Sequence, residues 1–287
     1  MRVIKREFFN VSRSDVFRII PIGDIHMGAA ACDEDLLRAV VKRIKDDGQA
    51  WWIGMGDMAD YIILKDPRSS IGTLADWVTL DDLVDLPKAE RDRLLDILRP
   101  IAPKCLALVC GNHEAAIHKH TERDVYSEIV AGVKGAGGFK TTDRLAIGFY
   151  GWLQLAFYRS ATKKQRGTMI NINLHHGYTA GRLAGSKALN MQRWLWTHNA
   201  DIVLMGHCHD TKIQPEAVEE IDRGGHVTTR TRCGAYTGTF LHTTNEDGPA
   251  TYAERRGYFP LPYGGVEIEL RPGQKERRGR IRMIYSY

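Results

Sequence analysis

The stretch "IVLMGHCHD", Ile202 to Asp210, carries four apolar residues into a glycine and then into two histidines that flank a cysteine. A short apolar run of this kind predicts a buried strand, which we expect to end at Gly206. The histidines would then lie on a loop that a rigid sheet holds in place. Because a His-x-His pair is also common in proteins that bind no metal, this pair indicates a site only if other segments bring partners to it.

Four other apolar segments of the chain also end in polar clusters. These clusters are Asp24 and His26, then Asp57 and Asp60, then Asn112, His113 and Glu114, and finally His175 and His176. Each alone has an ordinary explanation as a helix cap or a turn. In α/β proteins, however, ligands gather beyond the carboxyl ends of strands. Five such clusters in one chain therefore predict a single shared crevice.

The residue types in these clusters indicate metal binding. Carboxylate, imidazole and amide oxygen donors without a required thiolate suit Mn²⁺, Fe or Zn²⁺ better than Ca²⁺ or a structural zinc site. The set is too large for one ion. We therefore expect two divalent transition metal ions, with Mn²⁺ as first choice, about 3.5–4 Å apart and joined by a carboxylate, as in sites that catalyse displacement at phosphorus.

Length and composition place the chain among ordinary globular proteins. It has 287 residues, of which 43% are hydrophobic and 26% charged, and we expect one domain over residues 1–287. No segment approaches the ~20 apolar residues of a membrane span, and the N-terminus is charged. The five cysteines are scattered and do not form a disulfide framework. These features predict a cytoplasmic protein with reduced thiols, no membrane partner and no obligate protein partner.

The order of the predicted elements alternates between strands and helices. A helix from about Asp33, with apolar residues at a 3.6 period, is expected to end before Gly48. The stretch "RLAIGFYGWLQLAFYR" predicts a hairpin that turns near Gly151. A basic, β-rich segment closes the chain at about residues 264–287. Strands and helices in both halves predict two packed sheets with helices outside them.

Taken in order, the blocks "GDIH", "GDMAD", "GNHE", "LHHG" and "GHCH" resemble the calcineurin-like metallophosphoesterase superfamily. All five blocks of the family pattern are present between residues 23 and 209, and the resemblance is to a small bacterial or phage-type member. It implies an α/β fold: a two-sheet β-sandwich flanked by helices, in four α/β/β/α layers.

The resemblance also implies a role for each residue of the pattern. One metal would be held by Asp24, His26, Asp57 and His209, and the other by Asp57, Asn112, His175 and His207. Asp57 would bridge the two ions, and a hydroxide between them would attack phosphorus. The resemblance assigns His113 to stabilising the phosphoryl oxygens and protonating the leaving oxygen, with Asp60 as the carboxylate that orients it.

Two assignments depend on finer choices. Alternation along the preceding strand lets only one histidine of "LHHG" face the metals easily. Relatives with a His-x-Gly block use the first, so His175 is the predicted ligand, and His176 is left with a supporting or substrate-binding role. In "GYTAGR", Arg182 is a candidate phosphate contact. Cys208, between two ligands, is expected to point the opposite way and to fill space.

The predicted reaction is hydrolysis of a phosphodiester in a nucleotide or nucleic acid. The block "GDMAD" lacks the Asp-Arg-Gly continuation of protein phosphatases, which disfavours a protein substrate. The net charge is +5, and "YRSATKKQRG" and "RPGQKERRGRIRMIYSY" are basic clusters that would attract phosphates. The alternatives are a phosphomonoesterase acting on a small phosphate ester and a non-catalytic binding module built on the same fold.

Overall fold

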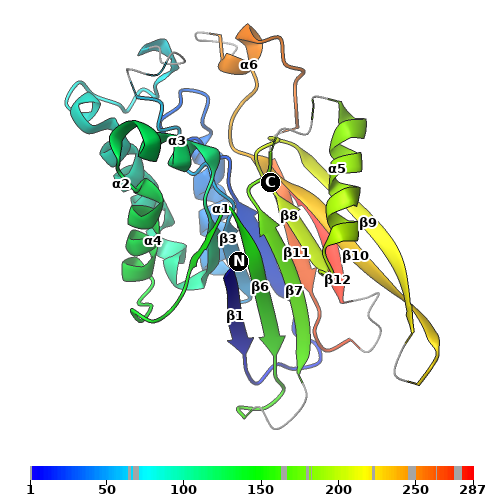
Figure 1. Ribbon diagram of the computed structural model, residues 1–287. Coiled ribbons are helices and arrows are strands. Elements are labelled where there is room, and N and C mark those ends of the chain that lie inside the picture. The colour runs from blue at the N-terminus through cyan, green and yellow to red at the C-terminus, as the bar shows by residue number, and fades with distance from the viewer. Residues whose placement is uncertain are drawn as a thin grey trace.

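The computed structural model describes residues 2–63, 66, 71–162, 167–178, 181, 183–221, 224–244, 250–262, 264–274 and 280–287. Two β-sheets pack face to face, and helices cover their outer faces (Figure 1). This arrangement confirms the predicted α/β sandwich. In the described part of the chain, no helix is long and apolar enough to cross a membrane.

The first sheet is built around parallel strands. Its strands, in spatial order, are β12 (Ile281–Ser286), β11 (Gly264–Leu270), β2 (Phe17–Ile22), β3 (Ala50–Gly54), β4 (Cys105–Val109) and β5 (Ala146–Gly148). Strands β2 to β5 are parallel, whereas β11 runs antiparallel to both β2 and β12. The basic C-terminal segment therefore forms an antiparallel extension of this sheet.

The second sheet mixes both orientations. Its strands, in spatial order, are β1 (Arg2–Phe8), β6 (Tyr150–Phe157), β7 (Thr168–His175), β8 (Ile202–Met205), β10 (Val227–Thr239) and β9 (Thr211–Ile221). Strand β7 is antiparallel to β6 and parallel to β8. A two-residue pairing of Gly238 and Thr239 with the start of β11 joins the two sheets at one corner.

Side-chain alternation along the strands produces the layers. In β2, Ile19 points into the core between the sheets, while Ile20 and Ile22 point into the core under the helices. The helices that cover the first sheet are α1 (Glu34–Asp46), α2 (Leu86–Leu98) and α4 (Val125–Ala136). Helix α5 (Ala184–Thr197) covers the second sheet. The order of layers is thus helix, sheet, sheet, helix.

Helix α1 begins as the sequence predicts. The Asp33 carboxylate accepts a hydrogen bond from the Leu36 backbone amide at 2.8 Å and caps the helix. Its buried face consists of Leu37, Val40, Val41 and Ile44. Burying each of these side chains contributes about 1.5–3 kcal/mol, so packing rather than intrinsic propensity holds this helix against the sheet.

The predicted hairpin near Gly151 is wrong. Strand β5 pairs with β4 in the first sheet, and β6 pairs with β1 and β7 in the second, so the two strands belong to different sheets. Gly148, with φ of 84°, lies where the chain crosses between them. A hairpin would have left the edges of β4 and β1 without these partners, and unpaired edges are unfavourable.

The two ends of the sandwich differ in what they carry. The carboxyl ends of β2, β3, β4, β7 and β8 all lie at one end, together with the short helices α3 (Asn112–Thr121) and α6 (Tyr252–Arg255) (Figure 1). The connections from β6 to β7 and from β11 to β12 lie at the opposite end, where Thr168 Oγ1 donates to the Pro272 carbonyl at 2.8 Å. Residues 163–166 and 275–279, which include most of the lysines and arginines of the two basic clusters, lie outside the described residues.

Candidate metal centre

Five loops converge at the carboxyl ends of the strands, as the sequence predicts. They carry Asp24 and His26 after β2, Asp57 and Asp60 after β3, Asn112 and His113 after β4, His176 after β7, and His207 and His209 after β8. Both sheets contribute. The site therefore lies across the open end of the sandwich and depends on the packing of one sheet against the other.

The backbone of these loops is locally strained. In the described part of the chain, nine non-glycine residues have positive φ. Five of the nine are Asp24, His26, Asp57, His207 and His209, with φ between 47° and 68°. Each such residue costs on the order of 1–3 kcal/mol and persists only where the surrounding structure requires it. Strain concentrated in a cluster of polar residues is typical of a functional site.

The first group of donors joins Asp24, His26 and His209. The Nε2 atoms of the two histidines lie 3.1 Å apart, and His209 Nε2 lies 3.5 Å from Asp24 Oδ1. Nδ1 of His26 donates to the Asp60 carboxylate at 3.0 Å, which leaves a lone pair on its Nε2 in the neutral form. Burial lowers the pKa of His26 and favours that form. A cation is the natural partner for lone pairs turned toward one another and toward a carboxylate.

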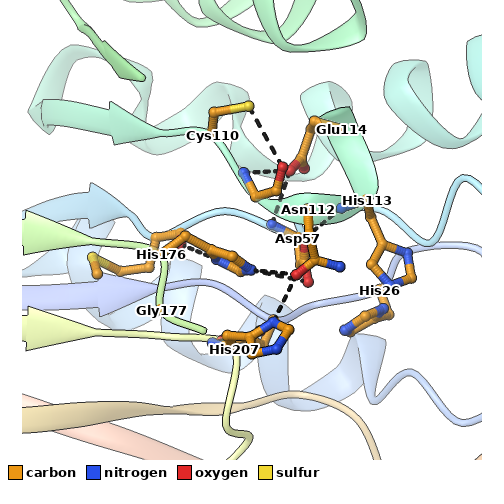
Figure 2. A network of polar contacts seen from close by, with 12 residues as sticks. His26, Asp57, Cys110, Asn112, His113, Glu114, His176, Gly177 and His207 are labelled. Atoms are coloured by element: carbon orange, nitrogen blue, oxygen red, sulfur yellow. Dashed lines mark hydrogen bonds and ion pairs between the residues drawn. The ribbon is translucent and has the colours of Figure 1, made fainter. Parts of the chain in front are cut away.

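The second group contains Asp57, Asn112, His176 and His207 (Figure 2). His176 Nδ1 donates to the Met55 carbonyl at 2.8 Å, and in the neutral form Nε2 turns its lone pair toward Asp57 Oδ2 at 3.1 Å and Asn112 Oδ1 at 3.0 Å. His207 Nδ1 lies 2.6 Å from the same Asn112 oxygen. Four acceptors facing one point form a set suited to a second cation.

The electrostatics of the second group point the same way. Burial opposes a positive charge on His176, but Asp57 outweighs it and raises the pKa of His176 to about 10. Burial likewise opposes the negative charge of Asp57, yet the neighbouring His176 holds the pKa of Asp57 below its ordinary value. The Asp57 side chain is 2% exposed. A buried carboxylate of this kind requires a positive partner.

Glu114 holds two of the loops together. Its buried carboxylate accepts hydrogen bonds from the backbone amides of Asp57 at 3.0 Å, Met58 at 2.7 Å and Gly111 at 2.8 Å (Figure 2). A Cβ on Gly111 would lie 2.2 Å from the Asp57 backbone nitrogen, so only glycine fits there. Glu114 thus fixes the loop after β3 against the start of α3, a role that the sequence motif alone does not specify.

His113 lies beside the first group rather than within it. Its ring meets the His26 ring edge-on, with centroids 4.6 Å apart, and its backbone amide donates to Asp57 Oδ1 at 2.9 Å. His113 Nδ1 donates to the backbone carbonyl of Asp60, whereas the Asp60 carboxylate lies 3.6 Å away and accepts from His26. Burial lowers the pKa of His113, but Asp57 and Asp60 outweigh it, and the net shift is upward. Asp60 therefore contacts the imidazole through its main chain.

The prediction that His175 lies with the carboxylates is wrong. Ile172 and Leu174 point into the core between the sheets, so alternation along β7 sends His175 the other way. Its ring packs 4.8 Å from Trp194 of α5, and its Nδ1 accepts from the Gly177 amide at 2.6 Å. Burial lowers the pKa of His175 to about 4. His176, on the inward face, takes the position that the family pattern had assigned to its neighbour.

Cys208 lies between two ligands in the sequence but does not join them in space. It is half-buried, packs against the core under α5, and belongs to none of the metal-ligating groups found among the described residues. Its role as a space-filling side chain is thus compatible with its surroundings. Arg182, the candidate phosphate contact, lies outside the described residues.

A cavity of about 350 Å³ opens above the two groups. Its floor includes His26, Asp57, His113 and His209, and part of its wall comes from a segment between β10 and β11. We call this segment, residues 241–244 and 250–262, the cap loop; it includes α6 (Figure 1). Sequence patterns did not identify it, because it has no periodicity and contains only scattered aromatic residues.

Hydrogen bonds fix the base of the cap loop. The His242 amide donates to the Ala31 carbonyl at 2.8 Å, which ties the loop to the segment before α1. The Leu261 amide donates to Thr243 Oγ1 at 3.4 Å, and Thr251 Oγ1 donates to the Thr243 carbonyl. The two ends of the loop therefore lie next to each other, as in a compact surface loop.

Comparisons with known proteins identify one family and several distantly similar structures. The family model for calcineurin-like phosphoesterases matches residues 17–211. A metallophosphoesterase from Sphaerobacter thermophilus is 13% identical with a TM-score of 0.38, covering 94% of this chain and 89% of its own. Vps29 from Chaetomium thermophilum is 14% identical with a TM-score of 0.35, covering 94% of each chain. The NAD nucleotidase of Haemophilus influenzae is 10% identical with a TM-score of 0.39, and the match covers 95% of this chain and 49% of the nucleotidase. A search of curated protein sequences found no match.

Proposed function

The chain belongs to the calcineurin-like phosphoesterase family, and from this premise we propose that it is a phosphodiesterase that uses two divalent metal ions. Its substrate is a phosphodiester of the nucleotide or nucleic-acid class. Mn²⁺ is the first choice of metal, with Fe and Zn²⁺ as alternatives, because imidazole, carboxylate and amide oxygen are the donors present.

The observation that carries the proposal is the pairing of two donor groups around buried carboxylates. Asp24, His26 and His209 would hold one ion, and Asn112, His176 and His207 the other, with Asp57 shared. When bound, two such ions supply Lewis acidity and a hydroxide nucleophile at neutral pH. A protein that only presented this fold as a binding platform would have no need for strained, buried ligands, which argues against the non-catalytic alternative.

His113 supplies the proton for the leaving oxygen. Its Nδ1 proton is engaged by the Asp60 carbonyl, so Nε2 is the nitrogen available on the side of the ring that lines the cavity. The raised pKa of His113 favours the protonated imidazolium, the form that a general acid requires. The ligand atoms of His26, Asp60 and His113 lie within 4.8 Å of one another, but the Asp60 carbonyl engages Nδ1 of His113, so we assign this side chain to the substrate and not to a metal.

The charge around the cavity favours a diester over a monoester. A monoester carries a second negative charge, which calls for additional cationic side chains. Among the described residues that line the cavity, Arg255 is the one lysine or arginine. A singly charged diester matches this lining better. The alternative is a phosphomonoesterase, and comparing the hydrolysis of a diester with that of a monoester distinguishes the two functions.

The test combines metal analysis with hydrolysis of bis(4-nitrophenyl) phosphate and 4-nitrophenyl phosphate. We expect wild-type protein purified with Mn²⁺ to retain metal and to prefer the diester. His113→Ala should lower kcat on the diester about 10²- to 10⁴-fold, the usual contribution of a general acid, without loss of metal. His120→Ala, an exposed histidine on the same helix, is the matched control. Preference for the monoester, or failure to retain any metal, would contradict the proposal.

A further inference from the structure

The cap loop presents large apolar side chains to the cavity. The Phe259 side chain is 66% exposed and the Tyr258 side chain 39% exposed, and both line the cavity above the metal centre. Small residues, Ala29, Ala30 and Ala31, line the same cavity from the segment before α1. Exposed aromatic rings and small side chains around one cavity leave room for a flat group, and exposed apolar surface beside a site commonly marks a binding wall.

The size of the cavity restricts what it can hold. At about 350 Å³ it lies at the lower end of the roughly 300–1,000 Å³ range of small-ligand pockets. Such a space accepts one organic group beside the phosphate and does not accept a duplex. The floor is polar and the cap-loop wall is largely apolar. A matching ligand therefore has a polar half that faces the floor and an apolar half that faces the cap loop.

The charge distribution argues against a polymer as the ligand of this cavity. Binding of nucleic acid depends on many cationic contacts along the phosphate backbone. Of the two basic clusters, the described Arg159 and Arg271 follow the ends of β6 and β11, at the opposite end of the sandwich, where Thr168 meets Pro272. The end that carries the metal centre offers Arg255 among the described lysines and arginines that line the cavity.

We propose that the cap loop binds a planar aromatic group of nucleobase size on one side of the scissile phosphodiester, with Phe259 as the specificity-determining side chain that packs against the ring. This inference rests on the proposed phosphodiesterase function and narrows its substrate to a small nucleotide-like diester. Stacking of a base on an aromatic side chain tolerates many ring types, which suits a wall with one exposed phenylalanine.

The experiment uses three diesters that share the 4-nitrophenyl leaving group and one negative charge. They are methyl 4-nitrophenyl phosphate, phenyl 4-nitrophenyl phosphate and thymidine 5′-(4-nitrophenyl phosphate). In each, water forms the new P–O bond and the bond to 4-nitrophenolate breaks, so only the retained group differs. We expect the Mn²⁺-loaded wild-type protein to hydrolyse the thymidine ester with the highest kcat/KM.

Phe259→Ala should lower kcat/KM for the thymidine ester about 10-fold, equivalent to about 1.4 kcal/mol, a typical value for base stacking. The methyl ester should change less than about twofold, because its retained group has no ring to pack against Phe259. Phe259→Trp should still hydrolyse the thymidine ester with a higher kcat/KM than the methyl ester. Trp196→Ala removes an aromatic side chain of similar exposure, 65%, from the outer face of α5 and should leave all three rates unchanged.

The outcomes separate this inference from the proposed function. Equal losses for the methyl and thymidine esters in Phe259→Ala would overturn the inference while the phosphodiesterase stands. A phenyl ester that responds like the thymidine ester would support an aromatic wall that makes no contact with the sugar. If only 4-nitrophenyl phosphate were hydrolysed, the proposed phosphodiesterase function would be wrong. Calorimetric measurement of ligand binding would then test whether Phe259 packs against an aromatic ring. In that case a 10-fold weaker Kd of Phe259→Ala for thymidine 5′-monophosphate, with inorganic phosphate unchanged, supports the wall. An unchanged Kd overturns it.

Discussion

The metal centre and the cap loop border the same cavity and are built in opposite ways. Most side chains of the metal centre are buried or half-buried, several lie on strained backbone, and hydrogen bonds tie its loops to both sheets. The cap loop consists mostly of exposed side chains and is attached through a few hydrogen bonds at its base. The difference teaches that the reaction and the choice of substrate can be carried by structures of different rigidity, so mutations in the two regions should have separable effects.

The largest expected effect comes from Asp57→Asn, which removes the charge of the carboxylate that we propose both metal ions share and keeps its shape. Charge stabilisation by metal ions is worth several kcal/mol, so we expect kcat/KM for a diester to fall about 10³-fold or more. Metal content measured after gel filtration should fall with it. Asp35→Asn, on the exposed face of α1, is the control. Full metal content in Asp57→Asn would show that the two groups do not depend on this carboxylate.

The adjacent histidines of β7 provide a sharper test with a smaller effect. His176→Ala should lower both metal content and kcat/KM, by about 10- to 100-fold, as losses around metal sites commonly do. His175→Ala should leave metal content unchanged and instead lower the free energy of unfolding by about 0.5–3 kcal/mol, because its ring packs on Trp194. Metal analysis and urea unfolding of both variants check this. If His175→Ala lost metal and His176→Ala kept it, His175 would be the metal ligand.

Much of the metal centre could be predicted from the sequence because each ligand block is recognised from the residues immediately before it. Each ligand block follows an apolar run that folds as a strand, and carboxyl ends of parallel strands meet at one edge. Asp24, Asp57, Asn112 and His207 therefore come together as expected. The start of α1 at Asp33 was predictable for the same reason, since a capping carboxylate is decided within three residues.

Features that depend on the packing of distant segments could not be predicted. The choice of His176 requires knowing that Ile172 and Leu174 face the other sheet, and both faces of β7 are covered. The crossing at Gly148 depends on which sheet edges are free, not on the stretch itself. The described arginines of the basic clusters, Arg159 and Arg271, follow strand ends at the far end of the sandwich, and the sequence alone does not show this. The cap loop has no pattern that marks its position over the site.

The smallest expected effect on the chemistry follows from removing the cap loop altogether. Residues 244–260 can be replaced by Gly-Ser-Gly, because the Leu261 amide lies 3.4 Å from Thr243 Oγ1 and a short linker spans the ends. Metal content should not change, and kcat/KM for methyl 4-nitrophenyl phosphate should stay within about threefold, as for surface changes elsewhere. Each halving of loop length recovers about 0.6 kcal/mol of closure entropy, which offsets the few hydrogen bonds removed with the loop, so the unfolding midpoint should move little.

A two-residue Asn-Gly turn in place of residues 222–226, which connect β9 to β10, is the control for loop shortening. This change lies far along the second sheet from the metal centre and should alter neither the rates nor the metal content. Loss of metal from the protein without its cap loop, with the control intact, would show that the loop supports the metal centre. The two regions would then have to be regarded as one structure, because the buried ligands would owe their positions to the exposed segment above them.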